Sequence, residues 1–380
     1  MKWEKKTLDE LGTVGRGRSK HRPRNDPKLF GGKYPFIQTA DVKNANFYII
    51  NFSSTYNEEG LAQSKLWPAG TLCITIAANI ADTGILAIPA CFPDSIMGFV
   101  ANEEIADTRF VKYCFDVLQK ECKQISQGTA QDNLSWEKLS TIKFLVPPLQ
   151  TQKRIASILS AYDDLIENNQ KQIKLLEEAA QRLYKEWFVD LRFPGHESVK
   201  IVDGVPEGWS SDQLIKLAEF KRGKTITKSS VKEGNVPVIA GGLEPAYFHN
   251  VANTVAPVIT VSASGANAGY TALHNHNVWA SDCSFIDSKI CEHIYYVYNF
   301  LKTNKNMMLN LQKGSAQPHV YAKNINELIL LIPEEKVLKE YSNKVEVIYK
   351  AIFHKSKQIS SLREARDRLL PKLMSGEIEV

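Results

Sequence analysis

The chain is a tandem repeat of itself, and this duplication restricts its possible folds more than any other feature of the sequence. In the middle of each copy, ITIAANIADTG from Ile74 matches ITVSASGANAG from Ile259, at a separation of 185 residues. QGTAQ and KGSAQ follow at a separation of 186. The residues near the start of each copy match at a separation of 206: Trp3, Leu8, Leu11, Arg16, Gly17 and Arg18 with Trp209, Leu214, Leu217, Arg222, Gly223 and Lys224. The first copy therefore carries roughly 21 additional residues between Arg18 and Ile74, the difference between 206 and 185.

Each copy begins with a globular part and ends with a helical one. Short β-branched and aromatic runs, separated by Gly, Pro and Asn, predict the strands of a mixed α/β domain. The runs are PFIQTADV, FYIINFSS and TLCITIA in the first copy, and VPVIAGG, APVITVSAS and NVWASDCSFID in the second. Short helices are expected over residues 107–124 and 290–304. The predicted divisions are globular domains at 1–147 and 208–333, helical segments at 148–190 and 334–380, and a linker at 191–207.

After Pro147-Pro148 the apolar residues recur every three or four positions, which is typical of a coiled-coil seam. About 40 residues at 1.5 Å each would give a helix about 60 Å long, which we interpret as a spacer. Connectivity predicts that the two helices pair antiparallel around a pseudo-twofold axis. The seam of the first copy contains Ile155, Leu159, Tyr162, Ile166, Asn169, Ile173, Leu176, Ala180, Leu183 and Trp187. Its equivalents 186 residues later include Tyr341, Val345, Ile348, Ile352, Lys355, Ile359, Leu362, Arg366, Leu369 and Leu373.

Two details of the seam yield further expectations. Asn169 and Lys355 occupy equivalent positions near the middle of each helix, so they are predicted to lie close together and to set the register. The alternative is that both residues only tolerate solvent at the rim of the seam. Pro371 lies in the last turn of the second seam and Gly376 lies where a helix would end, which leaves open whether the second helix is as long as the first.

A basic run of alternating cations is the clearest candidate for a ligand-binding segment. Residues 16–24 read RGRSKHRPR and contain no acidic residue, so the cations could follow a phosphate backbone. A solvated loop without a ligand is the alternative. The glutamines of the repeated G[TS]AQ motif could read bases or cap loops. The glycines of this motif and of the basic segments are interpreted as turn formers. The predicted DNA contacts are Arg16, Arg18, Lys20, Arg22, Arg24 and Gln131 in the first copy, and Lys221, Arg222, Lys224 and Gln317 in the second.

Length, charge and motifs exclude several classes of protein. A chain of 380 residues is too long for one ordinary core, and a net charge of +5 does not by itself indicate a nucleic-acid partner. MKWEKKTLDELG lacks the apolar stretch of a signal peptide, so we expect a soluble, cytoplasmic protein. The six cysteines form no CxxC pair and are interpreted as reduced structural thiols. No catalytic, nucleotide-binding or metal motif is recognisable, and the spacing of His274, His276, Asp282 and Cys283 fits no known metal site.

The helical segments carry a resemblance to a known family. FLVPPLQTQKRIASILSAYDDLIENNQKQIKLLEEAAQRLYKEWFV, preceded by QGTAQDNLSWEKL, closely resembles the first central region of type I restriction-modification specificity (S) subunits. LREARDRLLPKLMSGEI resembles the end of their second such region, and VPEGW resembles the start of their second target-recognition domain. The resemblance covers essentially the whole chain, in the order domain, helix, domain, helix.

This resemblance implies a non-catalytic, DNA-binding subunit. Each globular domain would read one half of a bipartite DNA target, while the helices set the spacing and dock two methyltransferase subunits. Restriction subunits would complete an adenine methyltransferase and ATP-dependent endonuclease, so S-adenosylmethionine, ATP and Mg²⁺ would be bound by partner subunits and no cofactor by this chain. A duplicated coiled-coil scaffold that binds only proteins is the alternative.

Overall fold

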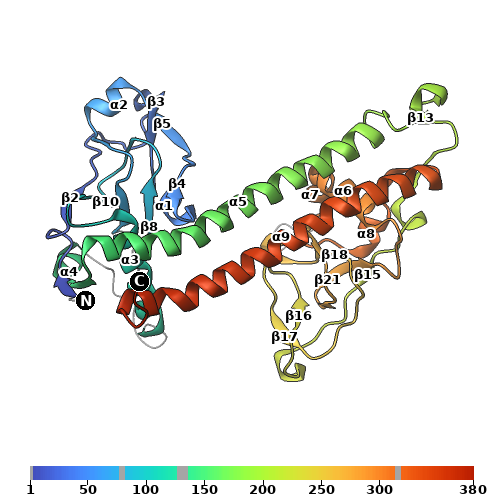
Figure 1. The fold of residues 1–380 in the computed structure, drawn as a ribbon. Helices are drawn as coiled ribbons and strands as arrows, with labels where there is room; N and C mark the ends of the chain where they lie inside the picture. Colours follow the sequence, from blue (N-terminus) through green and yellow to red (C-terminus); the bar gives the residue numbers. More distant parts are fainter. Residues whose placement is uncertain (1–2, 77–81, 126–135, 313–317) are drawn as a thin grey trace. The chain divides into compact units, whose positions relative to one another are not determined.

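The protein folds into two compact units, each of which combines segments from both copies of the repeat. The computed structural model describes residues 3–76, 82–125, 136–312 and 318–380. Unit 1 contains Met1–Gln170 and Lys357–Val380, and unit 2 contains Lys171–Ser356. Each unit therefore holds one globular domain and a part of each long helix (Figure 1). This division differs from the predicted one, in which each helical segment stands apart from the domains.

The domain of unit 1 contains a five-stranded sheet, a four-stranded sheet and a two-stranded ladder. The five-stranded sheet has the order β2-β10-β7-β8-β4, and the four-stranded sheet has the order β5-β3-β9-β6. β1 (Glu4–Lys6) pairs antiparallel with β11 (Phe144–Val146), directly before the long helix. The other strands are β2 (Gly12–Arg16), β3 (Phe30–Phe36), β4 (Tyr48–Ile49), β5 (Ser54–Tyr56), β6 (Leu66–Trp67), β7 (Leu72–Thr75), β8 (Thr83–Leu86), β9 (Ala90–Cys91) and β10 (Ile96–Ala101). The helices are η1 (Pro27–Leu29), α1 (Thr39–Asn44), α2 (Glu58–Ala62), α3 (Thr108–Ile125) and α4 (Trp136–Thr141).

The domain of unit 2 repeats this plan. Its main sheet has the order β15-β21-β18-β19, its second sheet has the order β17-β16-β20, and β14 (Ser210–Gln213) pairs with β22 (Ile329–Ile332). The remaining strands are β12 (Ile201–Val202), β13 (Val205–Pro206), β15 (Lys221–Arg222), β16 (Val236–Ile239), β17 (Tyr247–His249), β18 (Val258–Ser262), β19 (Thr271–His274), β20 (Trp279–Ala280) and β21 (Cys283–Asp287). The helices are η3 (His196–Ser198), η4 (Leu214–Lys216), η5 (Lys228–Ser230), η6 (Gly265–Asn267), α6 (Ile294–Thr303), α7 (Lys305–Asn310) and α8 (Ala322–Asn326).

The sheets confirm the duplication and locate the additional residues of the first copy. The order β2-β10-β7-β8 corresponds to β15-β21-β18-β19, with antiparallel neighbours in both. In each second sheet, one strand (β3 or β16) pairs antiparallel with one neighbour and parallel with another. The elements without a counterpart in unit 2 are α1, β4, α2 and β6, all between Arg18 and Ile74. The mixed α/β fold class is therefore confirmed for both domains.

One predicted strand is partly wrong. The run PFIQTADV continues β3 only to Phe36, and α1 begins at Thr39. The side chain of Asp41 accepts a hydrogen bond from the backbone N–H of Gln38 at 2.7 Å, which closes a capping box at the start of the helix. This local cap outweighs the β-propensity of the run.

The two helical segments form α5 (Leu149–Phe188) and α9 (Glu335–Ser375). The second helix is as long as the first, because α9 contains 41 residues and α5 contains 40. Pro371 lies inside α9, near its C-terminal end. Gly376 has a φ of +77° and ends the helix, as its position predicts.

Within each unit the helices pack antiparallel. In unit 1 the start of α5 shares a core with the end of α9, through Ile155 and Leu159 on one helix and Leu370 and Leu373 on the other. In unit 2 the end of α5 lies beside the start of α9, where the rings of Trp187 and Tyr341 are 5.7 Å apart (Figure 1).

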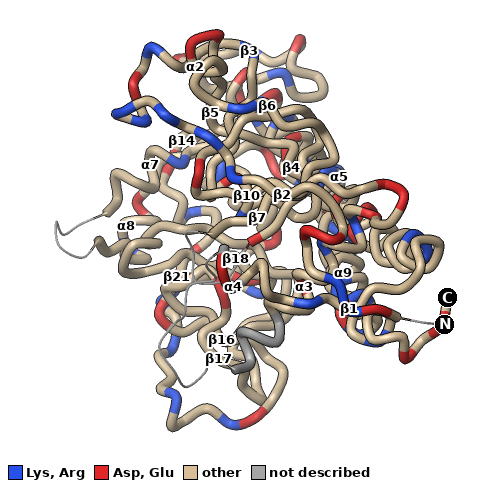
Figure 2. Tube along the Cα trace, turned by 90° about the vertical axis from the view of Figure 1, so that its left-hand side faces the viewer, with Lys and Arg blue, Asp and Glu red and all other residues tan. Residues whose placement is uncertain are grey.

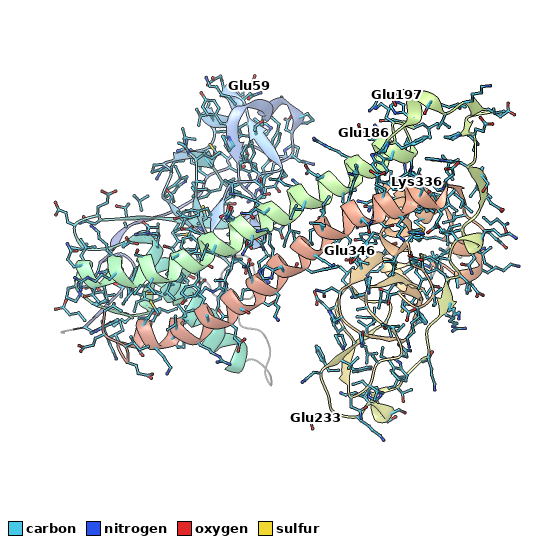
Figure 3. All side chains as sticks on the ribbon, turned by 45° about the vertical axis from the view of Figure 1, so that its right-hand side comes forward. Glu59, Glu186, Glu197, Glu233, Lys336 and Glu346 are labelled. Carbon is cyan, nitrogen blue, oxygen red and sulfur yellow. The ribbon has the colours of Figure 1, made fainter. Side chains whose placement is uncertain are left out.

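The predicted seam residues lie along an interior stripe of the two helices. None of the predicted seam residues is exposed. Asn169 is buried in unit 1 and Lys355 is half-buried in unit 2, and their predicted proximity stays a prediction. The buried face is wider than a two-position seam, because Ala156, Tyr184 and Tyr349 are also buried in cores shared with the globular domains. The outer faces are charged, and Figure 3 labels Glu186 of α5 and Lys336 of α9 as examples in unit 2.

Candidate nucleic-acid interface

The first basic segment, residues 16–24, begins as an extended strand that presents alternate side chains to solvent. Past the end of β2, the backbone N–H of Gly17 donates to the Ile96 carbonyl at 2.9 Å, and that of Arg18 donates to the Phe92 carbonyl at 2.9 Å. Gly17 and Ser19 are buried. The side chains between and beside them are exposed, and they belong to Arg16, Arg18 and Lys20.

The end of the same segment is bound to its own domain. Arg22 donates from Nη1 to the carbonyls of Ser19 and His21, at 2.7 and 2.8 Å. Arg24 forms an ion pair with Asp94 at 2.6 Å. In the part of the chain that the structure describes, the side chains of Arg16, Arg18 and Lys20 have no such ion-pair partner. Of the five predicted cations, Arg16, Arg18 and Lys20 are therefore available to contact a ligand, whereas Arg22 and Arg24 stabilise the loop.

The loop is also held by a histidine–aspartate contact. His21 Nε2 lies 2.8 Å from Asp26 Oδ2, and this hydrogen bond, followed by one from the Lys28 backbone, lowers the pKa of Asp26. No sequence pattern predicts this contact beyond the presence of both residue types, because the chain must first turn to bring them together.

The second basic segment, residues 221–224, occupies the equivalent position in unit 2. Its backbone repeats the same contacts, because Gly223 N–H donates to the Cys283 carbonyl at 2.8 Å and Lys224 N–H to the Ala280 carbonyl at 2.9 Å. Lys221, Arg222 and Lys224 are all exposed. Each predicted basic segment therefore lies at the edge of the main sheet of its own unit, and the two edges are equivalent.

A hollow beside the second segment adds residues that the sequence analysis missed. It has a volume of about 470 Å³, and its lining includes Lys224, Thr227, Lys232 and Trp279. The indole Nε1–H of Trp279 donates to the Lys224 carbonyl at 2.8 Å. A cationic hollow with an aromatic wall can hold an anion or stack a planar group. Lys232 and Trp279 lie in segments that only the tertiary fold brings near Lys224.

Gln131 and Gln317, together with the G[TS]AQ glycines Gly128 and Gly314, lie outside the described residues. Both charge types occur along the traces of both units, and Figure 2 shows Lys and Arg interspersed with Asp and Glu. The basic segments are therefore local features rather than parts of a uniformly positive protein.

Of the residues considered as metal ligands, His276 is exposed, and the other three are wholly or partly buried. His274 Nε2 lies 2.9 Å from Thr260 Oγ1, and burial, with a smaller effect of His276, lowers the pKa of His274 to about 4. Asp282 accepts a hydrogen bond from Ser264 Oγ at 2.7 Å. Burial raises the pKa of the Cys283 thiol to about 12. Five cysteines are buried, unpaired thiols: Cys73, Cys91, Cys114, Cys283 and Cys291.

A group of possible ligands that the sequence analysis did not name lies at the start of α9. The ligand atoms of Glu292, His293 and Glu335 lie within 4.8 Å of one another. His293 is buried, and its ring nitrogens contact Ser342 Oγ at 3.0 Å and the Glu335 carboxylate at 3.2 Å. Both nitrogens thus take part in packing α6 against α9.

Comparison with known proteins identifies the class to which this duplicated fold belongs. The family model of the type I restriction modification DNA specificity domain matches residues 1–178 and 206–360, which are the two copies of the repeat. The type I restriction enzyme MjaIX specificity subunit of Methanocaldococcus jannaschii is 25% identical, over 100% of this chain and 94% of its own length. The type I restriction enzyme HindI specificity subunit of Haemophilus influenzae is 23% identical, over 90% of this chain and 94% of its own length.

A solved structure shares the fold. The type I restriction-modification S subunit from M. genitalium superposes with a TM-score of 0.63 and 18% sequence identity, covering 98% of this chain and 96% of that one. The chain belongs to the type I restriction-modification DNA specificity family, and it is a DNA specificity subunit with two recognition domains. No helix among the described residues is long and apolar enough to cross a membrane.

Proposed function

We propose that each globular domain reads one half of a bipartite DNA site, and that each approaches DNA with its basic segment. The observation that carries this proposal is the equivalence of the two segments, each of which extends the edge strand of the same sheet with exposed cations. An extended strand with cations on alternate residues can contact successive phosphates, and an arginine can also read guanine. Arg16, Arg18 and Lys20, with Lys221, Arg222 and Lys224, would make these contacts, and Lys232 would join the second set.

The partner proteins would dock on the long helices. Exposed apolar side chains on these helices are available for such contacts, and they include Ile158 and Leu165 in unit 1 and Leu175 and Val347 in unit 2. Methyltransferase subunits would bind there, and restriction subunits would join the resulting complex. These partners would bring S-adenosylmethionine, ATP and Mg²⁺, and with them the methyltransferase and endonuclease activities.

The salt dependence of DNA binding tests this proposal. The complex of this chain with its methyltransferase subunits is titrated onto duplex DNA that contains its target, at several salt concentrations. The slope of log K against log salt is negative, and each phosphate contact that is lost reduces its magnitude by about 0.9. The triple variant Arg16→Gln, Arg18→Gln, Lys20→Gln is therefore expected to have a slope that is less negative by about 2.7.

The control is Lys33→Gln, which removes an exposed lysine that is paired with Glu58 at 3.3 Å in the same domain. Its slope should equal that of the wild type. An unchanged slope in the triple variant would show that the first basic segment does not contact DNA. A complex without any salt-dependent DNA binding would favour the alternative of a scaffold that binds only proteins.

A further inference from the structure

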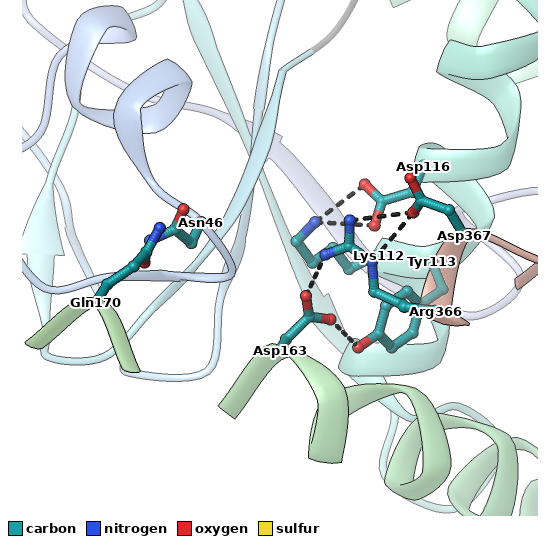
Figure 4. Close-up of polar contacts among 8 residues, drawn as sticks. All are labelled: Asn46, Lys112, Tyr113, Asp116, Asp163, Gln170, Arg366 and Asp367. Carbon is teal, nitrogen blue, oxygen red and sulfur yellow. Dashed lines mark hydrogen bonds and ion pairs between the residues drawn. The ribbon is translucent and has the colours of Figure 1, made fainter. Parts of the chain in front are cut away.

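Unit 1 contains a buried ionic cluster where α9 packs against α5 and α3. Asp163 of α5 is 6% exposed at its side chain and forms an ion pair with Arg366 of α9. Tyr113 of α3 donates its hydroxyl to the other oxygen of Asp163 at 2.6 Å (Figure 4). Arg366 also contacts Asp367 at 3.1 Å. Burial, together with Asp163, raises the pKa of Tyr113, so this hydroxyl remains a donor.

The neighbouring polar groups complete the cluster. Lys112, whose side chain is 5% exposed, forms an ion pair with Asp116 at 3.0 Å. These groups and the ion pair line a hollow of about 210 Å³. Among the described residues, Asp163 thus has one charged partner of opposite sign, and that partner comes from the other copy of the repeat.

The equivalent place in unit 2 has neutral chemistry. At a separation of 186 residues, Asp163 corresponds to Tyr349, Tyr113 to Asn299, and Arg366 to Ala180. The hydroxyl of Tyr349 donates to Asn299 Oδ1 at 2.8 Å, and Asn299 Nδ2 donates to the Tyr341 hydroxyl at 3.1 Å. Ala180 is fully buried in the same hydrophobic core as Tyr349. The two copies are therefore not interchangeable at this position.

This asymmetry has a consequence for pairing between copies. If two first copies paired, each Asp163 would face Ala180 instead of Arg366, and a buried carboxylate would lose its cation. If two second copies paired, Arg366 would face Tyr349 and Asn299, with Lys302 in the place of Asp116. Only the combination of a first copy with a second copy gives the buried Asp163 its cation, whereas Arg366 keeps the neighbouring Asp367 in either case.

We propose that Asp163 and Arg366 are a pairing determinant, which makes the first copy bind a second copy in preference to another first copy. The selected partner is the segment Lys357–Val380 of the same chain, and the rejected partner is the equivalent segment of a first copy, from the same or another molecule. This proposal does not depend on which DNA sequence the domains read. It predicts that the two copies find each other even when the chain is cut between them.

The test uses the full-length protein with a protease site inserted between Asp203 and Gly204, which are both exposed in the turn between β12 and β13. The folded protein is cut, exchanged through mild denaturant, and its species are counted by native mass spectrometry. Wild-type fragments are expected to return as complexes of one first and one second fragment, favoured at least about tenfold over pairs of like fragments. In the neutral double variant Asp163→Asn, Arg366→Gln this preference should disappear.

A matched control keeps stability separate from pairing. Glu346→Gln, Lys350→Gln neutralises an exposed ion pair of 2.9 Å on the same helix α9, and its fragments should pair as in the wild type. Thermal melting of the uncut variants monitors folding. The proposal is overturned if wild-type fragments pair with fragments of the same copy as readily as with fragments of the other copy. This first comparison uses the wild-type protein alone. The proposal is also overturned if the neutral double variant keeps the full preference.

Discussion

At the scale of single residues, Gly17 and Gly223 show why the repeat retains glycine at equivalent positions. Both are expected from the sequence to form turns, but the structure shows that glycine is required here because a side chain would not fit. A Cβ at Gly17 would lie 2.2 Å from the Pro93 carbonyl oxygen, and one at Gly223 would lie 2.2 Å from that of Ser281. Both glycines allow a backbone to pass close to the basic segment, so they support the proposed DNA contacts without making them.

Replacing Gly17 with alanine should therefore destabilise unit 1, because backbone atoms cannot move aside as a flexible side chain can. The expected loss is about 1–3 kcal/mol in the free energy of unfolding, measured by urea denaturation. Gly242→Ala is the matched control, since its Cβ would have 3.4 Å to the nearest atom. Equal midpoints for Gly17→Ala and Gly242→Ala would contradict the steric explanation.

His274 makes the stability of unit 2 depend on pH. Its folded-state pKa of about 4 lies below the ordinary value of 6.5, so between these values the unfolded chain binds a proton that the folded chain does not. The contribution of the neutral ring is complete above pH 6.5 and declines as the pH falls towards 4. The loss between pH 7 and pH 5 is at most about 2 kcal/mol.

Urea midpoints at pH 7 and pH 5 measure this dependence. His274→Gln retains a hydrogen-bonding group for Thr260 but does not titrate, so its midpoint should change less with pH than that of the wild type. Parallel pH profiles for the two proteins would show that another group is responsible.

At the scale of elements, α5 illustrates how one helix serves several neighbours. Its stripe of apolar residues packs on α9, while Tyr184 and Phe188 extend the buried face to the globular domain of unit 2. The ring of Phe188 lies 4.7 Å from that of Tyr296 and 4.8 Å from that of Tyr341. A helix that packs on both a second helix and a domain must bury more than a two-residue seam.

The same substitution at two positions of α5 separates its buried and exposed faces. Leu159 is 0% exposed and Leu175 is 63% exposed. Leu159→Ala should cost about 2–5 kcal/mol of unfolding free energy, because it leaves a cavity in a packed core. Leu175→Ala should change it by less than about 0.5 kcal/mol. Chemical denaturation of the two variants measures the difference, and similar losses would contradict this assignment of faces.

At the scale of the whole molecule, the main consequence of the fold is that each unit needs both copies of the repeat. The core of unit 1 contains Leu370, Leu373 and Met374, which the chain reaches only after it has completed the domain of unit 2. Unit 1 is therefore built from segments at the two ends of the sequence.

Truncation after Ser356 should expose this dependence. The shortened chain lacks three buried side chains of the unit 1 core and the arginine that pairs with Asp163, so residues 3–170 should lose most of their protection from hydrogen exchange. The domain of unit 2, including β14 and β22, serves as the internal control and should remain protected. Unchanged protection of unit 1 would mean that its domain is stable without the end of α9.

Several properties could be determined from the sequence by itself. The duplication, the mixed α/β class, the two long helices and their apolar stripes all follow from repeats and periodicity, which are local or regular features of the chain. The first basic segment was also found this way, because alternate exposure in an extended strand leaves an alternating pattern of cations, and the second is its equivalent in the repeat. Helix boundaries followed where caps were explicit, as at Gly376.

Other properties were decided only by the tertiary structure. It separated Arg22 and Arg24, which contact the loop and the domain, from Arg16, which has no ion pair among the described residues, and it placed Lys232 and Trp279 beside Lys224. It also paired Asp163 with Arg366 across 203 residues of sequence. The physical reason is that hydrogen bonds and ion pairs between distant segments depend on where the chain has been brought by packing, and no local pattern in the sequence records that position.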